Sequence, residues 1–416
     1  MKNIFRRISV LPFQGLYPKK SLAKAIISPP YDVLTTIEAK KLVESKENLF
    51  LHVIKPEIDF PESHNPYSTE TYSKGAKNLE SFIDQNWLIK DTIPRFYLYQ
   101  INSKNHSQTG FLAATSVKEY EEGLIKPHEL TREIKVNDRK NLIDIQNFNT
   151  EPVLLFYPHQ APIDELMHKV SQKKPEIDVV TDDGTQHVLW KCHGRLNNMI
   201  REQFRIVGKC YIADGHHRSE ASKVLAQERR KTNQKSSGFE YFLSVLFPDN
   251  QLKIMEYNRV IKKIPRNKSE NDLLKDLAKD FTIFPIVNPY PAEKKTFSMY
   301  LNSKWHGLKL KDQKSSNDES SIINSIDSYL LTKYCLDPIF EIKDIRKSDN
   351  IDFIGGIRGH EEIEKRCRED SEVGFLMYPV QISEIMNVAT NNLIMPPKST
   401  WFEPKPRSGI VIRSIL

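Results

Sequence analysis

Four residues whose side chains can do acid–base and phosphate chemistry stand within five positions of one another. They are Asp214, His216, His217 and Arg218, with Gly215 between them. A carboxylate can accept a proton, and an imidazole can accept or donate one. A guanidinium can bind a phosphate through its fork of N–H groups. This set could therefore combine proton transfer with phosphate binding at one place.

The pattern around this run predicts that it lies between a strand and a helix. Residues 207–213 form a short apolar segment, typical of a buried strand, and after Gly215 apolar residues return with helical spacing at Ala221, Val224 and Leu225. Open α/β sheets bind ligands at strand-to-helix turns, where the N–H groups at the start of the helix attract anions. The pattern therefore predicts an anion-binding turn.

Two simpler interpretations of the same run compete with this one. Asp-Gly is a common turn pair, so Asp214 could only cap the following helix, with His217 and Arg218 in solvent. The paired histidines could suggest zinc, but adjacent side chains point in different directions and no further Cys or His pair has ligand spacing. The density of functional groups favours the anion-binding turn.

Residues near the N-terminus add three candidate ligands. Two consecutive prolines fix the backbone just before Asp32, which predicts a rigid turn that ends in a carboxylate; an ordinary entry to a helix is the alternative. If the following apolar segment is a strand, Asn48 and His52 share one of its faces. They could then line a pocket, or His52 could be a core histidine.

A polar stretch between two predicted strands carries six more candidates. We interpret it as a loop suited to phosphoryl transfer, in which cations neutralise phosphate oxygens and carboxylates bind a metal or a proton. A solvent-exposed charged helix is the alternative. The candidates are His128, Glu129, Thr131, Arg132, Asp138 and Arg139, of which Glu129 and Asp138 are the candidate metal ligands.

A further candidate turn lies near the C-terminus, where Lys398, Ser399 and Thr400 stand between proline-containing segments. A lysine beside two hydroxyls resembles the phosphate-binding end of a P-loop, but the glycines of that loop are missing. The residues therefore predict a phosphate-binding turn that is not a P-loop. A strand that packs through the aromatic residues after Thr400 is compatible with it.

Composition excludes several classes of protein. The chain has 416 residues, enough for two or three domains, with 39% hydrophobic and 28% charged residues. It has no apolar run of the ~20 residues that a membrane span needs, no apolar signal region at its start, and four scattered cysteines, which suit a reducing compartment. We expect a cytoplasmic protein without a membrane partner.

The charge pattern points in the same direction. The net charge of +7 is modest for this length, and the lysines are spread along the chain. No concentrated basic surface for nucleic acid is indicated. A weak positive field does suit a small anionic substrate.

Helical and strand patterns alternate, which predicts an α/β chain of the α+β type with mixed sheets. A change in composition near residues 262–270 marks a domain boundary. We predict a catalytic domain at residues 1–262 and a smaller α/β domain at residues 263–416, whose last segment, about 390–416, returns to the active site. The polar stretches 227–238 and 311–321 are predicted surface loops.

Taken in chain order, these segments resemble the family catalogued as domain of unknown function 1015. Each motif alone is weak, but seven of them in the same order, between residues 29 and 405, cover nearly the whole chain. They are Pro29-Pro30-Tyr31-Asp32-Val33, Asn48 with His52, His128-Glu129-x-Thr131, Asp138-Arg139, Asp214-Gly215-His216-His217-Arg218, Asn258-Arg259 and Met395-Pro396-Pro397-Lys398-Ser399-Thr400.

The Asp-Gly-His-His-Arg element is also similar to the phosphate-binding element of the ParB/sulfiredoxin-like fold, which free L-serine kinases carry. The resemblance implies a core of that fold and a kinase that phosphorylates the hydroxyl of free L-serine. It implies inorganic pyrophosphate as the phosphoryl donor, Mg²⁺ as the cofactor, and O-phospho-L-serine, a precursor for cysteine, as the product. The absence of Gly-x-Gly-x-x-Gly and Walker A motifs agrees with a donor that has no base.

The hypothesis gives roles to the candidate residues. Asp214 would accept the proton of the serine hydroxyl. The transferred phosphoryl group would be held by His216, His217 and Arg218, with the helix N-terminus. The candidates for binding the leaving phosphate are Arg132, Arg139 and Lys398, and those for binding Mg²⁺ or the substrate ammonium are Glu129 and Asp138.

Other functions stay open on the sequence. The same site could use ADP or ATP, or could pass the phosphoryl group to water as a phosphoserine phosphatase. A ParB-like nucleic-acid-binding protein would need a helix-turn-helix or a basic face, and neither is clear. A non-catalytic binder of a phosphorylated metabolite needs cations more than carboxylates, so the acidic residues argue against it. The sequence leaves the oligomeric state open.

Overall fold

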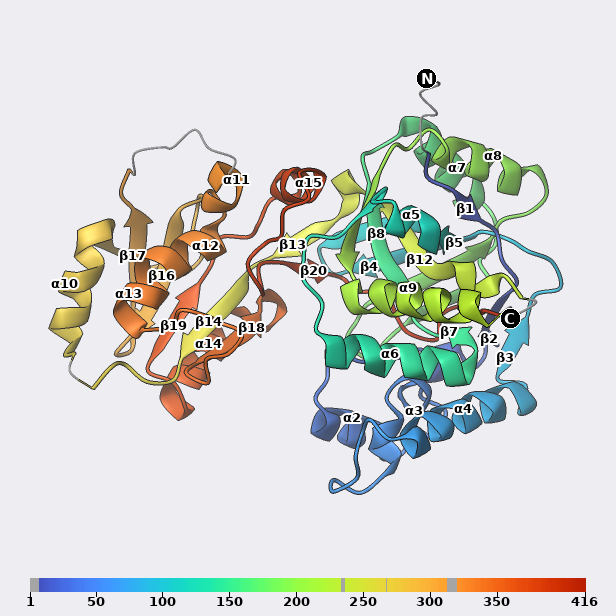
Figure 1. Cartoon of the computed structure of the whole chain (residues 1–416), viewed down its shortest axis with the longest axis horizontal. Coiled ribbons are helices and arrows are strands. Elements are labelled where there is room, and N and C mark those ends of the chain that lie inside the picture. Colours follow the sequence, from blue (N-terminus) through green and yellow to red (C-terminus); the bar gives the residue numbers. More distant parts are fainter. Residues whose placement is uncertain (1–6, 233–235, 267, 313–319) are drawn as a thin grey trace. The chain divides into compact units, whose positions relative to one another are not determined.

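The computed structural model describes residues 7–232, 236–266, 268–312 and 320–416, which fold into two compact units (Figure 1). The first unit comprises Met1–Pro127, Thr131–Leu252 and Pro404–Leu416, and the second comprises His128–Leu130 and Lys253–Glu403. Both units combine helices with sheets, so the predicted mixed α/β class is confirmed.

The first unit is built on a nine-stranded mixed sheet. Eight of its strands lie in the order β6-β11-β8-β12-β5-β4-β10-β9, and β1 also pairs with β5. The β8–β12 and β6–β11 pairs are parallel, and the other pairs are antiparallel. The strands are β1 (Val10–Leu11), β4 (Tyr97–Ser103), β5 (His106–Ser116), β6 (Ile125–Lys126), β8 (Val153–Tyr157), β9 (Ile177–Val180), β10 (Gln186–Lys191), β11 (Cys210–Asp214) and β12 (Tyr241–Pro248).

Amphipathic helices bury their apolar sides on this sheet. Helix α9 contributes Ala221 and Leu225 to the core, as its helical spacing predicts, and α6 packs beside it (Figure 1). The helices of the unit are α1 (Ala23–Ile26), α2 (Thr36–Val43), α3 (Leu51–Ile54), α4 (Thr69–Asp84), α5 (Val117–Glu121), α6 (Glu133–Gln146), α7 (Ala161–Ser171), α8 (Arg195–Phe204) and α9 (His216–Lys231), with short 3₁₀ turns η1 (Pro56–Asp59), η2 (Gly238–Glu240) and η3 (Asp249–Gln251).

A small second sheet ties distant parts of the chain together. Its order is β3-β2-β21-β7, with β2 (Gly15–Pro18), β3 (Leu88–Lys90), β7 (Phe148–Asn149) and β21 (Ile412–Ser414). The chain end therefore lies between a strand from the N-terminal region and a strand from the middle of the sequence.

The second unit has a six-stranded antiparallel sheet in the order β15-β17-β16-β19-β14-β18 and a separate pair, β13 with β20. Apolar residues alternate between the two faces, so that α10, α12 and α13 pack on one side and α14 on the other. The elements are β13 (Lys253–Met255), β14 (Tyr257–Ile261), α10 (Glu270–Asp280), β15 (Phe281–Pro285), β16 (Thr296–Leu301), β17 (Lys304–Leu310), α11 (Ser320–Asn324), α12 (Asp327–Leu331), η4 (Thr332–Leu336), α13 (Asp337–Phe340), β18 (Ile351–Gly355), η5 (Gly356–Arg358), α14 (Gly359–Glu369), β19 (Val373–Leu376), α15 (Ile382–Thr390) and β20 (Trp401–Glu403).

The division differs from the predicted domains at three places, one of which is that His128–Leu130 belong to the second unit. The second unit begins at Lys253, not at residue 263, because β13 and β14 pair with β20, β18 and β19. The last residues, 404–416, belong to the first unit, because β21 pairs with β2 and β7. Of the predicted loops, residues 227–231 continue α9, whereas 233–235 and 313–319 lie outside the described residues.

A buried histidine anchors the C-terminal segment in the first unit. Arg407 donates from Nε to Nε2 of His187 at 3.1 Å, and its backbone N–H donates to the hydroxyl of Tyr99 at 3.2 Å. His187 is fully buried, and its Nδ1 lies 2.8 Å from the same hydroxyl. Burial, reinforced by the charge of Arg407, lowers the pKa of His187 to about 3.

We expect acid to weaken the fold through His187. The unfolded chain binds a proton near pH 6.5 but the folded chain only near pH 3, so this contribution is complete above pH 6.5 and is lost as the pH falls toward 3. The slope is at most about 1.4 kcal/mol per pH unit. Urea unfolding would give the free energy of unfolding at pH 7.5 and at pH 5. The difference between these two values should be smaller for His187→Gln than for wild type.

The exposed His168 of α7 provides the matched control for this measurement. The His168→Gln variant should show the same difference in unfolding free energy between the two pH values as wild type. An unchanged difference in His187→Gln would contradict a neutral, buried His187.

Candidate functional site

The Asp214 turn has the predicted strand–turn–helix geometry. Strand β11 ends at Asp214 after an irregularity in its pairing with β8, and α9 begins at His216. Gly215 joins them with a φ of +98°, a left-handed conformation that glycine adopts without strain. A Cβ at this position would lie 3.1 Å from two nitrogens of Arg218, so the glycine also leaves room for the guanidinium.

Asp214 is paired with two cations. Its Oδ2 lies 2.6 Å from Nη2 of Arg218, and its Oδ1 lies 2.5 Å from Nζ of Lys405 in the C-terminal segment. Arg218 is also fixed by a 2.6 Å hydrogen bond from Nη1 to the carbonyl oxygen of Pro152. Burial alone would raise the pKa of Asp214, but Lys405 and Arg218 outweigh it and hold that pKa well below its usual range.

The two histidines of the turn have different surroundings. His216 is buried at the start of α9. His217 is partly buried, and its Nε2 accepts a 3.1 Å hydrogen bond from the backbone N–H of Arg132, which directly precedes α6. Burial, with the charge of Arg132, lowers the pKa of His217. His217 is therefore neutral, with its proton on Nδ1.

Asp32 is brought to the same place from the N-terminal region. Burial lowers the pKa of His217, and the negative charge of Asp32 acts in the opposite direction. Together with Asp214 and Glu151, Asp32 also raises the pKa of the buried Arg218. Its own side chain is exposed. The structure therefore brings Asp32 and Arg132, two of the predicted site residues, close to the Asp214 turn.

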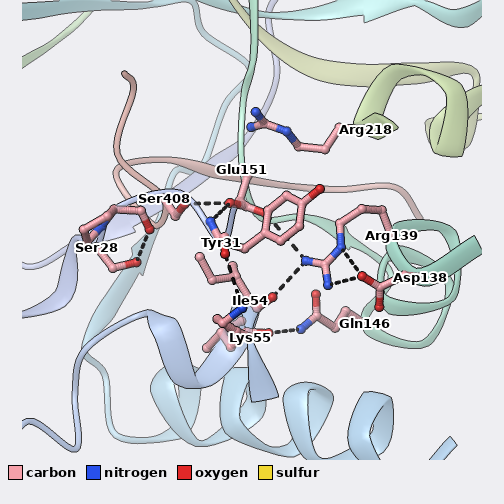
Figure 2. Close-up of polar contacts among 12 residues, drawn as sticks. Ser28, Tyr31, Ile54, Lys55, Asp138, Arg139, Gln146, Glu151, Arg218 and Ser408 are labelled. Carbon is pink, nitrogen blue, oxygen red and sulfur yellow. Dashed lines mark hydrogen bonds and ion pairs between the residues drawn. The ribbon is translucent and has the colours of Figure 1, made fainter. Parts of the chain in front are cut away.

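Glu151 is a further acid in this region that the sequence did not single out. It is 7% exposed, and its Oε1 accepts hydrogen bonds from the N–H of Tyr31 at 3.2 Å and from Oγ of Ser408 at 2.9 Å (Figure 2). Burial raises the pKa of Glu151, and the charges of Arg218 and Arg139 act against it. The sequence signal that could have identified Glu151 is its position directly before a proline and a buried apolar strand.

Asp138 and Arg139 hold each other inside the protein. The Nε and Nη2 atoms of Arg139 donate to Oδ2 of Asp138 at 3.2 and 2.9 Å, and its Nη1 donates to the carbonyl oxygen of Ile54 at 2.8 Å (Figure 2). The guanidinium also lies 4.0 Å from the centre of the Tyr31 ring, and the hydroxyl of Tyr72 donates to Oδ1 of Asp138. Both oxygens of Asp138 are engaged, which does not fit a metal ligand.

Two expectations about local structure are wrong. Residues 128–139 are not one loop, because α6 begins at Glu133 and places Asp138 and Arg139 on a buried helix face. Asn48 and His52 do not share a strand: Asn48 lies in a turn, and His52 lies in the short helix α3, where its Nδ1 contacts Oδ1 of Asp59 at 2.5 Å. Short apolar runs do not distinguish a strand from a helix turn.

All of the remaining candidates except Thr131 lie in the second unit. The hydroxyl of Thr400 contacts Nε2 of the buried His128 at 3.1 Å and a carboxylate oxygen of Glu129 at 3.3 Å. Ser399 is buried and donates to the carbonyl oxygen of Pro396 at 2.6 Å.

Lys398 is the exposed member of this group. It has a left-handed φ of +58°, its carbonyl oxygen accepts from Arg259 at 3.0 Å, and its Nζ donates to the hydroxyl of Tyr257 at 3.0 Å. Thr131, the last candidate, belongs to the first unit just before α6.

The described part of the chain lacks both a metal-binding cluster and a membrane-spanning helix. No group of three or more His, Cys, Asp or Glu side chains there is arranged to hold a metal ion. No helix in the same ranges combines the length and the apolar character that crossing a membrane requires.

Removing the cation of Lys405 should raise the pKa of Asp214. An opposite charge at this distance shifts a carboxyl pKa by about 1–3 pH units, so we expect a rise of that order in Lys405→Met. Carbon NMR of labelled aspartate side chains would follow it. Lys405→Arg keeps the charge and should leave the pKa low; equal pKa values in all three proteins would mean that Arg218 alone sets it.

Comparison with known proteins places the chain in a family. None of the curated proteins matches it. Several solved structures resemble it in part, and those named here each cover about 70% of this chain. C-terminally truncated SbnI from Staphylococcus aureus is 12% identical over 71% of this chain and 85% of its own, with a TM-score of 0.39. A free serine kinase in complex with AMP is 12% identical over 70% and 86%, with a TM-score of 0.33.

A conserved hypothetical protein from Pyrococcus furiosus is 13% identical over 71% of this chain and 91% of its own, with a TM-score of 0.32. Identities this low do not establish a shared activity. The family match is broader: the model described as "Protein of unknown function (DUF1015)" matches residues 10–329. The chain therefore belongs to the DUF1015 family of proteins of unknown function.

Proposed function

We propose that this protein is a kinase that transfers a phosphoryl group from inorganic pyrophosphate to the hydroxyl of free L-serine. The observation that carries the phosphate part of the proposal is the pairing of one carboxylate, Asp214, with two cations, Arg218 and Lys405, at the start of α9. The pair of cations exceeds the carboxylate by one charge, and the helix N-terminus adds partial positive charge. Such a place suits a phosphate group.

Serine as acceptor and pyrophosphate as donor rest on the resemblance of the motifs, as does a ParB/sulfiredoxin-like core. In the proposed reaction the serine Oγ forms a bond to one phosphorus of pyrophosphate, and the bond from that phosphorus to the bridging oxygen breaks. Inorganic phosphate leaves with the bridging oxygen, and O-phospho-L-serine is formed. The hydroxyl proton passes to a carboxylate of the protein.

Two carboxylates are available to take that proton, and their surroundings separate them. Asp214 is held in two ion pairs that keep its pKa low, which makes it a weak base and suits it to orient Arg218 and Lys405. Asp32 is exposed beside the same turn, and no hydrogen bond engages its carboxylate in the described residues. We therefore assign proton acceptance to Asp32 in place of the earlier assignment to Asp214.

Mg²⁺ would reach the site on the pyrophosphate. The described residues offer no cluster of ligands for a resident metal, and Mg²⁺ commonly binds through substrate phosphates with one or two carboxylates. When bound, it supplies charge neutralisation to the phosphate oxygens. The protein's own part is to hold those oxygens at Arg218, Lys405 and the start of α9.

A donor screen tests the function directly. Purified protein with L-serine and Mg²⁺ would receive pyrophosphate, ADP, ATP or polyphosphate, and mass spectrometry would detect O-phosphoserine. We expect product with pyrophosphate. Product with a nucleotide alone would contradict the donor, and phosphate release from O-phosphoserine without any kinase activity would favour a phosphatase.

Variants of the two carboxylates should behave differently. We expect Asp32→Asn to lower kcat about 10²-fold or more with little change in phosphate affinity, because it removes a proton acceptor. Asp214→Asn should change phosphate affinity as well, because it releases Arg218 and Lys405. Steady-state kinetics measures the effect on turnover, and calorimetry measures the effect on phosphate affinity. Near-normal turnover in Asp32→Asn would refute the assignment of Asp32 as the proton acceptor.

A further inference from the structure

Glu151 has no part in the phosphoryl transfer described above, although it is buried among the charges of that site. Three separate segments meet at its carboxylate: Tyr31 and Ser408 donate to its Oε1, and Nη1 of Arg139 lies 3.9 Å from its Oε2 (Figure 2). In the described residues this long contact is the only ion pair of Glu151. Its charge is therefore not consumed by a close partner.

Two arginines, Arg218 and Arg139, act on the charge of Glu151. The charges of both arginines lower the pKa of this acid against the effect of burial. Conversely, Asp214 and Glu151 raise the pKa of Arg218 against the effect of burial. Glu151 and both arginines also line one small pocket of about 20 Å³, which has room for a single water molecule.

The residues that the ion pairs of this region join carry equal numbers of positive and negative charges in the absence of a ligand. Arg139, Arg218 and Lys405 provide three positive charges, and Asp138, Asp214 and Glu151 provide three negative ones. Asp138 and Asp214 are in direct contact with their cations, whereas Glu151 interacts with Arg139 and Arg218 without a hydrogen bond to either. A phosphate that binds at Arg218 is therefore repelled by the charge of a nearby buried carboxylate that has no close cationic partner.

We propose that the charge of Glu151 limits the affinity of Arg218 for phosphate, so that the site releases its anionic products. Glu151 is thus a positioning residue that acts through Arg218 and does not touch the substrate. The inference rests on the proposed phosphate site, but not on serine as the acceptor or on pyrophosphate as the donor.

The Glu151→Gln variant isolates this charge. Glutamine has the same shape, and its Oε1 can still accept from Tyr31 and Ser408, so the fold is preserved while the charge is lost. Calorimetry of inorganic phosphate binding to the full chain should show an affinity about three- to tenfold higher than that of wild type. In turnover, the variant should lower both KM for the donor and kcat, because tighter product binding slows release.

Glu119 offers the matched control. It is a partly buried acid of the same unit, its pKa is raised to about 7 by burial, and it accepts from the N–H of Ser9, away from the arginines. At pH 8, above this pKa, Glu119 is mostly ionised, so the Glu119→Gln variant removes a negative charge from the protein and should bind phosphate as wild type does. An equal gain in both variants would show an effect of net charge alone and would overturn the proposal.

A second variant covers the case in which Glu151→Gln does not fold. Ser408→Ala removes one hydrogen bond to the charged form of Glu151, which favours the neutral form, so phosphate binding should tighten in the same direction by a smaller factor. Unchanged or weaker phosphate binding in these variants, or none in any protein, overturns the inference. The binding measurement uses neither serine nor turnover, so its result does not depend on whether the kinase assay succeeds.

Discussion

Arg218 is fixed at two points, by the carboxylate of Asp214 and by the carbonyl oxygen of Pro152, and the charge pattern of the site depends on this double contact. A guanidinium that is 7% exposed would be costly to bury without such partners. Gly215 makes the contact possible, because its positive φ and its missing Cβ let the chain turn tightly beside the guanidinium. The turn thus combines backbone freedom with a rigid cation.

The C-terminal segment completes the first unit, both mechanically and electrostatically. Lys405 reaches Asp214, Arg407 binds the buried His187, and Ser408 donates to Glu151. Strand β21 then pairs with β2 and β7. Four successive anchors within about ten residues leave this segment little freedom, so the ammonium of Lys405 is held beside Asp214.

The candidates in the second unit differ in what their side chains already bind. Ser399 and Thr400 are buried and engaged by Pro396, His128 and Glu129, so their hydroxyls shape the turn. Lys398 keeps an exposed ammonium beside the hydroxyl of Tyr257, on a backbone whose carbonyl oxygen is held by Arg259. Of the Lys-Ser-Thr triplet, the lysine is therefore the member suited to meet a ligand.

The sequence by itself determined the strand–turn–helix at Asp214, because apolar periodicity and a glycine are local signals that tertiary contacts did not override. It also identified the mixed α/β class from the alternation of patterns. It did not place His52, because a six-residue apolar run fits a short helix as well as a strand.

Only the tertiary structure decided which charges meet. The pairings of Lys405 with Asp214 and of Ser408 with Glu151 span 191 and 257 residues, and they follow from where β21 and β8 lie in their sheets. The burial of Asp138 and Arg139 likewise depends on α6 packing beside α9 and α4. Residue types state what chemistry is possible, but charge balance depends on distance and burial, which the fold alone sets.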